Sequence, residues 1–286
     1  MNTSYQPYAV ELHNVGYKYG SHVAVADVTE TIEAGKITGL LGRNGSGKTT
    51  LEMLIAGQMK ATGRVLVDGQ DVWENPRIMP NVALVSDAPA VYEDSKLLNT
   101  ISLWEHVRPT FLREVVESLL DAWEIDLKKS PEKLSRGQKS AFYAALGIGA
   151  RAPLTIFDEV HLGMDAVLRR DFYDALLQDF IAYPRTVIIS SHNVDEIENL
   201  IENVMIMDAG RIVASGTADD VRAAYSTAGR VASLTDVLAA TNSRRTGAQA
   251  LTGLRERDDD GGAAREPGAA GQPGEADQRG EHGTEA

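Results

Sequence analysis

Residues 42–50 read Gly42-Arg43-Asn44-Gly45-Ser46-Gly47-Lys48-Thr49-Thr50, between an apolar run at 37–41 and a second at 51–55. This context predicts a buried strand, a glycine-rich loop and a helix, in which the spacing G-x-x-x-x-G-K-[S/T] binds phosphates. Glycine lets the loop backbone curl, so that successive N–H groups point at a polyphosphate beside the positive end of the helix. A glycine-rich turn that only caps a helix is the alternative, and the complete spacing argues against it.

Two side chains of this loop have predicted roles of their own. Lys48 is expected to reach the β- and γ-phosphates, and the Thr49 hydroxyl is expected to help hold Mg²⁺. The remaining loop residues are predicted to cradle the phosphates with them: Gly42, Arg43, Asn44, Gly45, Ser46, Gly47 and Thr50.

The composition limits the domain organisation and the partners. From about residue 241 the chain of 286 residues is rich in Gly, Ala and Pro and has almost no large apolar residue, which predicts a disordered acidic tail. The net charge of −13 argues against a nucleic-acid binder. The chain has no cysteine, which fits the cytosol. Without a signal-peptide pattern or eighteen consecutive apolar residues, membrane contact is expected only through a partner.

Apolar residues alternate before the loop. Residues 8–13 and 23–32 are predicted to be strands of a small antiparallel sheet, with Tyr17 and Tyr19 in the turn between them. A tyrosine next to a nucleotide loop can stack on an adenine ring, although core packing is the simpler interpretation of the sequence alone.

The pattern changes to helical spacing at residues 95–127, which predicts two amphipathic helices with Trp104 and Trp123 as their own core. The other expected elements are strands at 63–69, 82–86, 204–208 and 211–214, helices at 167–182 and 218–225, and a turn around 234–239.

Two further segments carry polar residues at strand and helix ends. The segment Leu134-Ser135-Arg136-Gly137-Gln138 opens a helix predicted at 138–150, with Ser135 as its N-cap and with free N–H groups that suit an anion. The strand at 154–159 ends in Asp158 and Glu159, whose side chains diverge, so that one can serve Mg²⁺ and the other can orient the attacking water. Taken alone, these are a helix start and two acids at an exposed strand end.

A third polar residue, His192, follows the β-branched strand predicted at 186–190. This strand is expected to be parallel to the acidic one, which would bring His192 to the same edge of the sheet as Lys48 and Glu159.

These motifs, in this order and at these separations, resemble the ATP-binding domain of ABC transporters over about residues 8–216. The resemblance implies an α/β fold: a P-loop NTPase core with a mainly parallel sheet, a small N-terminal antiparallel β subdomain and an inserted α-helical subdomain. We expect an ATP-binding domain at 1–225 with the helical insert at about 88–137, a short ordered extension at 226–240 and the tail at 241–286.

The resemblance also implies a head-to-tail dimer that encloses two ATP molecules, and an Mg²⁺-dependent ATPase. Ser135, Gly137 and Gln138 would reach the γ-phosphate held by Lys48 of the opposite subunit. Glu159 would be the general base or the residue that positions the attacking water, and His192 would contact the γ-phosphate. The remaining roles would be Mg²⁺ binding for Asp158, the dimer interface for Asp165 and adenine stacking for Tyr19.

Three positions depart from the family pattern. Arg136 stands where glycine is usual, in a direction expected to point away from the phosphate. Asp87 stands where a glutamine normally links Mg²⁺ and the attacking water to the membrane subunit, so metal affinity and coupling are both affected. Val160-His161 replaces the usual proline-threonine after the acidic pair, and the sequence offers no physical reason for this change.

The predicted protein is therefore the ATPase subunit that drives export through a separate transmembrane permease, at the cytoplasmic face of the membrane, as a homodimer or a heterodimer with another ABC ATPase. The export branch is suggested by the short helical insert and by the segment after Ser190. Two alternatives stay open: a nucleotide-gated regulatory module with weak hydrolysis, for which Asp87 is the main support, and an ABC ATPase that acts on DNA or ribosomes.

Overall fold

The computed structural model describes residues 6–86, 94–227 and 229–241, so Asp87 and residues 242–286 of the expected tail lie outside the described residues. The strands are β1 (Val10–Tyr19), β2 (His22–Ile32), β3 (Ile37–Leu41), β4 (Thr62–Val67), β5 (Gln70–Asp71), β6 (Val82–Val85), β7 (Leu154–Asp158), β8 (Thr186–Ser191), β9 (Asn203–Asp208) and β10 (Arg211–Thr217). The α-helices are α1 (Lys48–Ile55), α2 (Leu97–Val107), α3 (Arg113–Ala122), α4 (Arg136–Ala150), α5 (Ala166–Ala182), α6 (Ala218–Tyr225) and α7 (Leu234–Ala240). Three 3₁₀ turns complete the order: η1 (Met79–Asn81), η2 (Pro131–Lys133) and η3 (Val194–Glu196).

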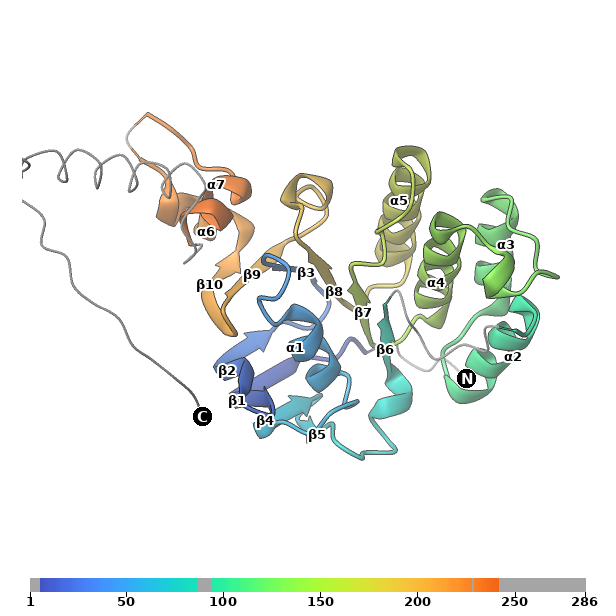
Figure 1. Ribbon diagram of the computed structural model, residues 1–286, viewed down its shortest axis with the longest axis horizontal. Coiled ribbons are helices and arrows are strands. Elements are labelled where there is room, and N and C mark those ends of the chain that lie inside the picture. The colour runs from blue at the N-terminus through green and yellow to red at the C-terminus, as the bar shows by residue number, and fades with distance from the viewer. Residues whose placement is uncertain (1–5, 87–93, 228, 242–286) are drawn as a thin grey trace, which may run out of the picture. The chain divides into compact units, whose positions relative to one another are not determined.

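A six-stranded sheet in the order β10-β9-β3-β8-β7-β6 positions the site (Figure 1). Every neighbouring pair is parallel except β10 with β9. Because parallel strands end at one edge, the loops after β3, β7 and β8 carry residues 42–50, Glu159 and His192 to the same place. The expected parallel pairing of the acidic strand with the strand before His192 is confirmed.

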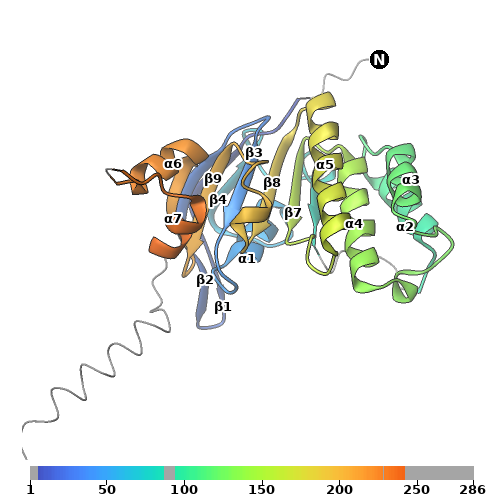
Figure 2. The same cartoon turned by 90° about the horizontal axis from the view of Figure 1, so that it is seen from above.

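Side chains of the parallel strands alternate between two apolar cores, one on each face of the sheet. The first core joins Leu40 of β3 to Leu51 and Leu54 of α1 and to the antiparallel strands β1, β2 and β4, so α1 packs with both sheets. The second core joins Leu41, the next residue of β3, to helices α2 to α7, which cover the other face (Figure 2). The mainly parallel sheet, the antiparallel β subdomain and the added helices confirm the predicted fold class.

The four-stranded antiparallel sheet has the order β2-β1-β4-β5 and shows one wrong prediction. Tyr17 and Tyr19 lie within β1, which continues to a turn at residues 20–21, and not in a turn of their own. The register of β1 against β2 shifts at three points, and Asn14 and Asp27 have positive φ, as in β-bulges. Bulges interrupt the apolar alternation that marks a strand, which explains why the strand looked shorter in the sequence.

Helices α2 and α3 confirm the helical pattern, but they have no separate core. Trp104 packs 6.3 Å from Phe111, ring centre to ring centre, and Trp123 lies at the edge of the same apolar cluster as α4 and β6. The expected turn around 234–239 is helix α7, whose N-cap Ser233 forms a capping box with Asp236. Among the described helices, none combines the length and the apolar character that a membrane crossing requires.

Candidate nucleotide-binding site

The glycine-rich loop leads from β3 into α1 and leaves the start of this helix open. Gly47 is the N-cap with φ of 110°, and no side chain caps the helix. The loop is held from outside, because the Gly210 N–H of the β9–β10 turn donates to the Ser46 carbonyl at 2.8 Å. The first turn of α1 therefore presents uncapped N–H groups at the carboxyl edge of the sheet, where an anion is stabilised.

The Lys48 side chain is buried beneath the loop. Its Nζ donates to the Gly42 carbonyl at 2.8 Å and to the Arg43 carbonyl at 3.4 Å, and it lies 3.2 Å from Glu159 Oε1. The ammonium group is thus positioned within the loop, with one carboxylate as its counter-charge. A phosphate that approaches Lys48 competes with Glu159 for the same cation.

Glu159 lies between Lys48 and His192. The same Oε1 atom is 3.2 Å from His192 Nδ1. Burial alone would raise the pKa of Glu159, but Lys48 and His192 outweigh burial and lower the pKa. The Glu159 backbone has φ of 46°, a strained conformation for a residue with a side chain, and its N–H donates to Ser190 Oγ at 3.1 Å. The structure therefore holds an ionised carboxylate, an acceptor for a proton of water, at a set position.

Asp158 is the last residue of β7, and Glu159 follows the end of the strand. The Asp158 carboxylate is buried and accepts a hydrogen bond from the Ser190 hydroxyl at 2.9 Å, across the β7–β8 pair. Ser190 thus fixes both acidic residues, a role that sequence reasoning missed although this serine precedes His192 by two residues. Asp158 and Thr49 offer a carboxylate and a hydroxyl, oxygen donors that fit Mg²⁺ when phosphates and water complete the coordination.

Glu52 is a second carboxyl group beside Asp158 that sequence reasoning missed. It projects from α1, is fully buried, and neither of its oxygens has a hydrogen-bond partner by distance and angle among the described residues. Burial first, and then the neighbouring Asp158, raise the pKa of Glu52 well above its ordinary value. The available signal was one acidic residue within the apolar run at 51–55.

We expect the free energy of unfolding of the Glu52→Gln variant to exceed that of the wild type by about 1–3 kcal/mol near pH 8. The folded protein keeps the Glu52 proton above pH 4.5, where the unfolded chain has released it, so wild-type stability falls as the pH rises. Glutamine has nearly the same shape and does not titrate. Denaturant unfolding of both proteins between pH 5 and 8 measures the effect.

The control is Glu33→Gln, the same substitution at an exposed position. A Glu52→Gln difference that stays constant or shrinks with rising pH would contradict the assignment of a buried, protonated Glu52.

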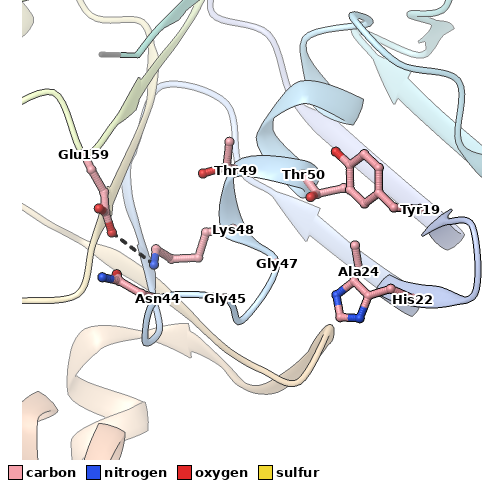
Figure 3. A pocket seen from close by; sticks show the side chains of 10 residues that line it. All are labelled: Tyr19, His22, Ala24, Asn44, Gly45, Gly47, Lys48, Thr49, Thr50 and Glu159. Atoms are coloured by element: carbon pink, nitrogen blue, oxygen red, sulfur yellow. Dashed lines mark ion pairs between the residues drawn. The ribbon is translucent and has the colours of Figure 1, made fainter. Parts of the chain in front are cut away.

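A cavity of about 440 Å³ extends from Glu159 and Lys48 to Tyr19. Figure 3 shows Tyr19 and His22 on one side of the loop and Glu159 on the other, so the cavity has an aromatic end and a charged end. Tyr19 is 48% exposed, and its ring packs edge-to-face with that of Tyr17 at 4.9 Å, centre to centre. His22 is a lining residue that the sequence did not reveal. Asn44, Gly45, Gly47, Thr49 and Thr50 line the cavity, whereas Gly42, Arg43 and Ser46 do not.

Ser135, Gly137, Gln138 and Asp165 line a separate cavity of about 770 Å³. Ser135 Oγ accepts from the Gln138 N–H and Gln138 Oε1 accepts from the Ser135 N–H, both at 3.2 Å, so the predicted N-cap is confirmed as a capping box. Asp165 is the N-cap of α5, and its carboxylate accepts hydrogen bonds from the N–H groups of Val167 and Leu168. Within one chain, the structure therefore does not bring this group to Lys48. The ligand roles of these residues stay predictions, and Asp87 lies outside the described part of the chain.

The chain is similar to known proteins over about three quarters of its length. The sequence profile of the family described as ABC transporter matches residues 25–161. The chain is 28% identical over 217 residues to the ABC transporter ATP-binding protein YtrB of Bacillus subtilis (strain 168), covering 76% of this chain and 74% of that protein.

Two other relatives are named for opposite directions of transport. One is a spermidine/putrescine import ATP-binding protein, PotA of Nitrosomonas eutropha, with 30% identity over 73% of this chain and 59% of its own length. The other is a lipopolysaccharide export system ATP-binding protein, LptB of Haemophilus influenzae, with 28% identity over 73% of this chain and 90% of that protein. In three dimensions, the chain resembles the ATP binding subunit of an ABC transporter, with a TM-score of 0.73, 23% identity, and coverage of 81% of this chain and 98% of that one.

Proposed function

This chain contains the ATP-binding domain of the ABC transporter family, and we propose that it is the ATP-hydrolysing subunit of a transporter whose membrane-spanning part is a separate protein. The observation that carries the proposal is the contact of Lys48 and His192 with the same oxygen of Glu159, both at 3.2 Å, beside the cavity that Lys48 and Glu159 line. A phosphate-binding cation, a base and a third polar group therefore meet at one point.

The residues of the site suggest how the reaction proceeds. The N–H groups at the start of α1 and Lys48 bind the β- and γ-phosphates, and Tyr19 lies where an adenine ring could stack. Lys48 exchanges Glu159 for phosphate, which releases this carboxylate to accept a proton from the attacking water. His192 stays close enough to donate to a γ-phosphate oxygen. Thr49 and Asp158 would hold Mg²⁺, which when bound neutralises charge on the phosphates.

We also propose that two copies complete the site. Ser135 and its helix start form an anion-binding group that does not reach Lys48 within one chain, and Val167, beside this group, is 73% exposed. A head-to-tail dimer would place Ser135 of one copy against the γ-phosphate bound by Lys48 of the other, so that ATP joins the two copies and its hydrolysis separates them.

The Ser135→Asp variant tests this dimer. Aspartate caps a helix as well as serine does, so α4 is expected to keep its start, but a carboxylate at this position repels the γ-phosphate. We expect ATP-dependent dimerisation, followed by light scattering, and ATP turnover both to fall at least about 100-fold, as for a lost transition-state contact. Ser135→Asn, which caps without charge, is the matched control and should keep most of the activity.

Mixing two inactive variants tests whether the site is shared. A mixture of Ser135→Asp with Lys48→Ala contains heterodimers in which Lys48 of one copy faces an intact Ser135 of the other. Recovery of turnover in the mixture supports the shared site. If the mixture is as inactive as its components, the site is complete within one chain and the dimer proposal fails.

Export through a permease at the cytoplasmic membrane face is a separate part of the proposal. It rests on the short helical insert and on the segment after Ser190, while relatives are named for both import and export. Co-purification of a membrane protein from native membranes supports the permease, and the side of a sealed vesicle on which substrate accumulates determines the direction.

A further inference from the structure

A buried polar cluster lies next to Glu159 and His192, and the mechanism above does not use it. Its members are His161, Tyr173 and Glu196. Four of their atoms are buried without a hydrogen-bond partner by distance and angle within residues 6–86, 94–227 and 229–241: His161 Nδ1 and Nε2, the Tyr173 hydroxyl and Glu196 Oε2. Buried polar atoms without a partner are rare in folded proteins, so four in one place require an explanation.

Side chains outside the cluster contact one oxygen of Glu196. Glu196 Oε1 accepts from Asn193 Nδ2 and lies next to Arg169 Nη1 of α5, both at 2.8 Å. The other oxygen, Oε2, faces His161 Nε2 at 3.4 Å. This separation is about 0.5 Å longer than a good N–H···O hydrogen bond. A small displacement of His161 would therefore complete the contact with Glu196.

The ring of His161 is suited to this contact. Burial lowers the pKa of His161, against the opposing influence of Glu196 and Glu159, so the ring is neutral near pH 7. A neutral imidazole has one N–H donor, which the carboxylate of Glu196 can accept. Neither side chain lines the cavity between Lys48 and Tyr19.

The position of the pair in the chain connects it to the site. His161 follows Glu159 by two residues in the loop between β7 and α5, and Glu196 follows His192 by four in η3. The two segments thus meet twice, through Glu159 with His192 and through His161 with Glu196. Since Glu159 is also paired with Lys48, its carboxylate loses one of its two ion-pair contacts when Lys48 turns to phosphate.

We propose that His161 and Glu196 are a positioning pair. Their contact forms when Glu159 leaves Lys48, and it then holds Glu159 and His192 in place for the attack of water on the γ-phosphate. The pair rests on the proposed function, since it serves the hydrolysis step. The unpartnered atoms are then the open state of a contact that forms during the reaction. The replacement of the usual threonine by His161, which had no explanation from the sequence, acquires one.

Steady-state ATP turnover of His161→Leu tests the pair. Leucine is apolar and of similar size, so the cluster stays filled while its donor is lost. We expect kcat to fall about 10- to 100-fold from the misplacement of Glu159, with KM and ATP affinity unchanged. His161→Gln, whose amide can still donate to Glu196, should restore most of kcat.

Three controls separate positioning from damage to the fold. Tyr173→Phe removes another unpartnered atom of the cluster and should leave kcat unchanged. Thermal unfolding of His161→Leu should match or exceed the wild type, because buried unpartnered nitrogens are removed. The double variant of His161→Leu with Glu196→Leu should lose no more kcat than the more impaired single variant, because the two residues act as a unit.

The outcomes are distinguishable. Unchanged kcat in His161→Leu, a parallel loss of thermal stability, additive losses in the double variant, or failure of His161→Gln to recover activity each overturns the pair. Absence of ATP turnover in the wild type overturns the proposed function instead. If ATP affinity falls together with kcat, the residues act in binding and the positioning role is wrong.

Discussion

Replacing Glu159 with glutamine is expected to stop ATP turnover while ATP stays bound. Glutamine keeps the shape of the side chain but cannot accept the proton of the attacking water, and the loss of a general base costs about 10²- to 10⁴-fold in kcat. The ion pair with Lys48, 3.2 Å long, also disappears. Lys48 is then free to bind phosphate, and a negative charge no longer opposes the nucleotide, so ATP affinity should be equal to or higher than that of the wild type.

The measurement is the steady-state ATPase rate with Mg²⁺ for both proteins, beside light scattering for the ATP-bound dimer. Glu202→Gln is a matched control, because it makes the same substitution and also breaks a lysine–glutamate ion pair, with Lys36, at an exposed position. Its turnover should equal that of the wild type. If Glu159→Gln retains turnover, another group is the base.

The ATP turnover rate of the wild type is informative by itself. If the wild type and Glu159→Gln both bind ATP and neither hydrolyses it, the chain is a nucleotide-gated module, or a partner supplies what the site lacks. Asp87 would then be the first residue to exchange for glutamine.

Replacing Gly47 with alanine is expected to disrupt the phosphate loop itself. A Cβ at Gly47 would lie 2.3 Å from the Ala24 carbonyl oxygen, which is backbone and cannot turn aside, and φ is +110°. The left-handed backbone costs about 1–2 kcal/mol for a residue with a side chain, and the overlap adds about 1–3 kcal/mol. We therefore expect the unfolding free energy to fall by about 2–5 kcal/mol and ATP affinity to fall with it.

Gly45→Ala is the matched control in the same loop. Its φ is +79°, but its Cβ would have no protein atom within 4 Å, so only the backbone cost of about 1–2 kcal/mol applies. Denaturant unfolding without nucleotide compares the two variants directly. Equal losses would show that the contact with Ala24 does not constrain the loop.

The local features of this protein could be predicted from its sequence. The loop at 42–50, the strand that ends in Asp158 and the capped helix after Ser135 follow from apolar periodicity, glycine placement and capping chemistry within a few neighbouring residues. The shared edge for Lys48, Glu159 and His192 followed from one further rule, that parallel strands end on the same side. These local patterns, with the rule for parallel strands, are enough to determine the fold class.

Contacts between distant segments could not be predicted in this way. The bulges that carry β1 through Tyr19, the common core of α2, α3 and α4, and the double role of Ser190 depend on which surfaces meet in the folded chain. Buried polar groups show this most clearly, because a glutamate in a sequence normally indicates an exposed position.

The sequence by itself determined that this chain builds an α/β domain with a glycine-rich phosphate loop and two consecutive acidic residues at one sheet edge. Only the tertiary structure decided that Lys48 and His192 share one oxygen of Glu159, that Glu52 is buried beside Asp158, and that His161 faces Glu196. The physical reason is the distance along the chain over which each effect acts. Propensity and capping act over a few residues, whereas burial and the charges that accompany it are properties of groups brought together by folding.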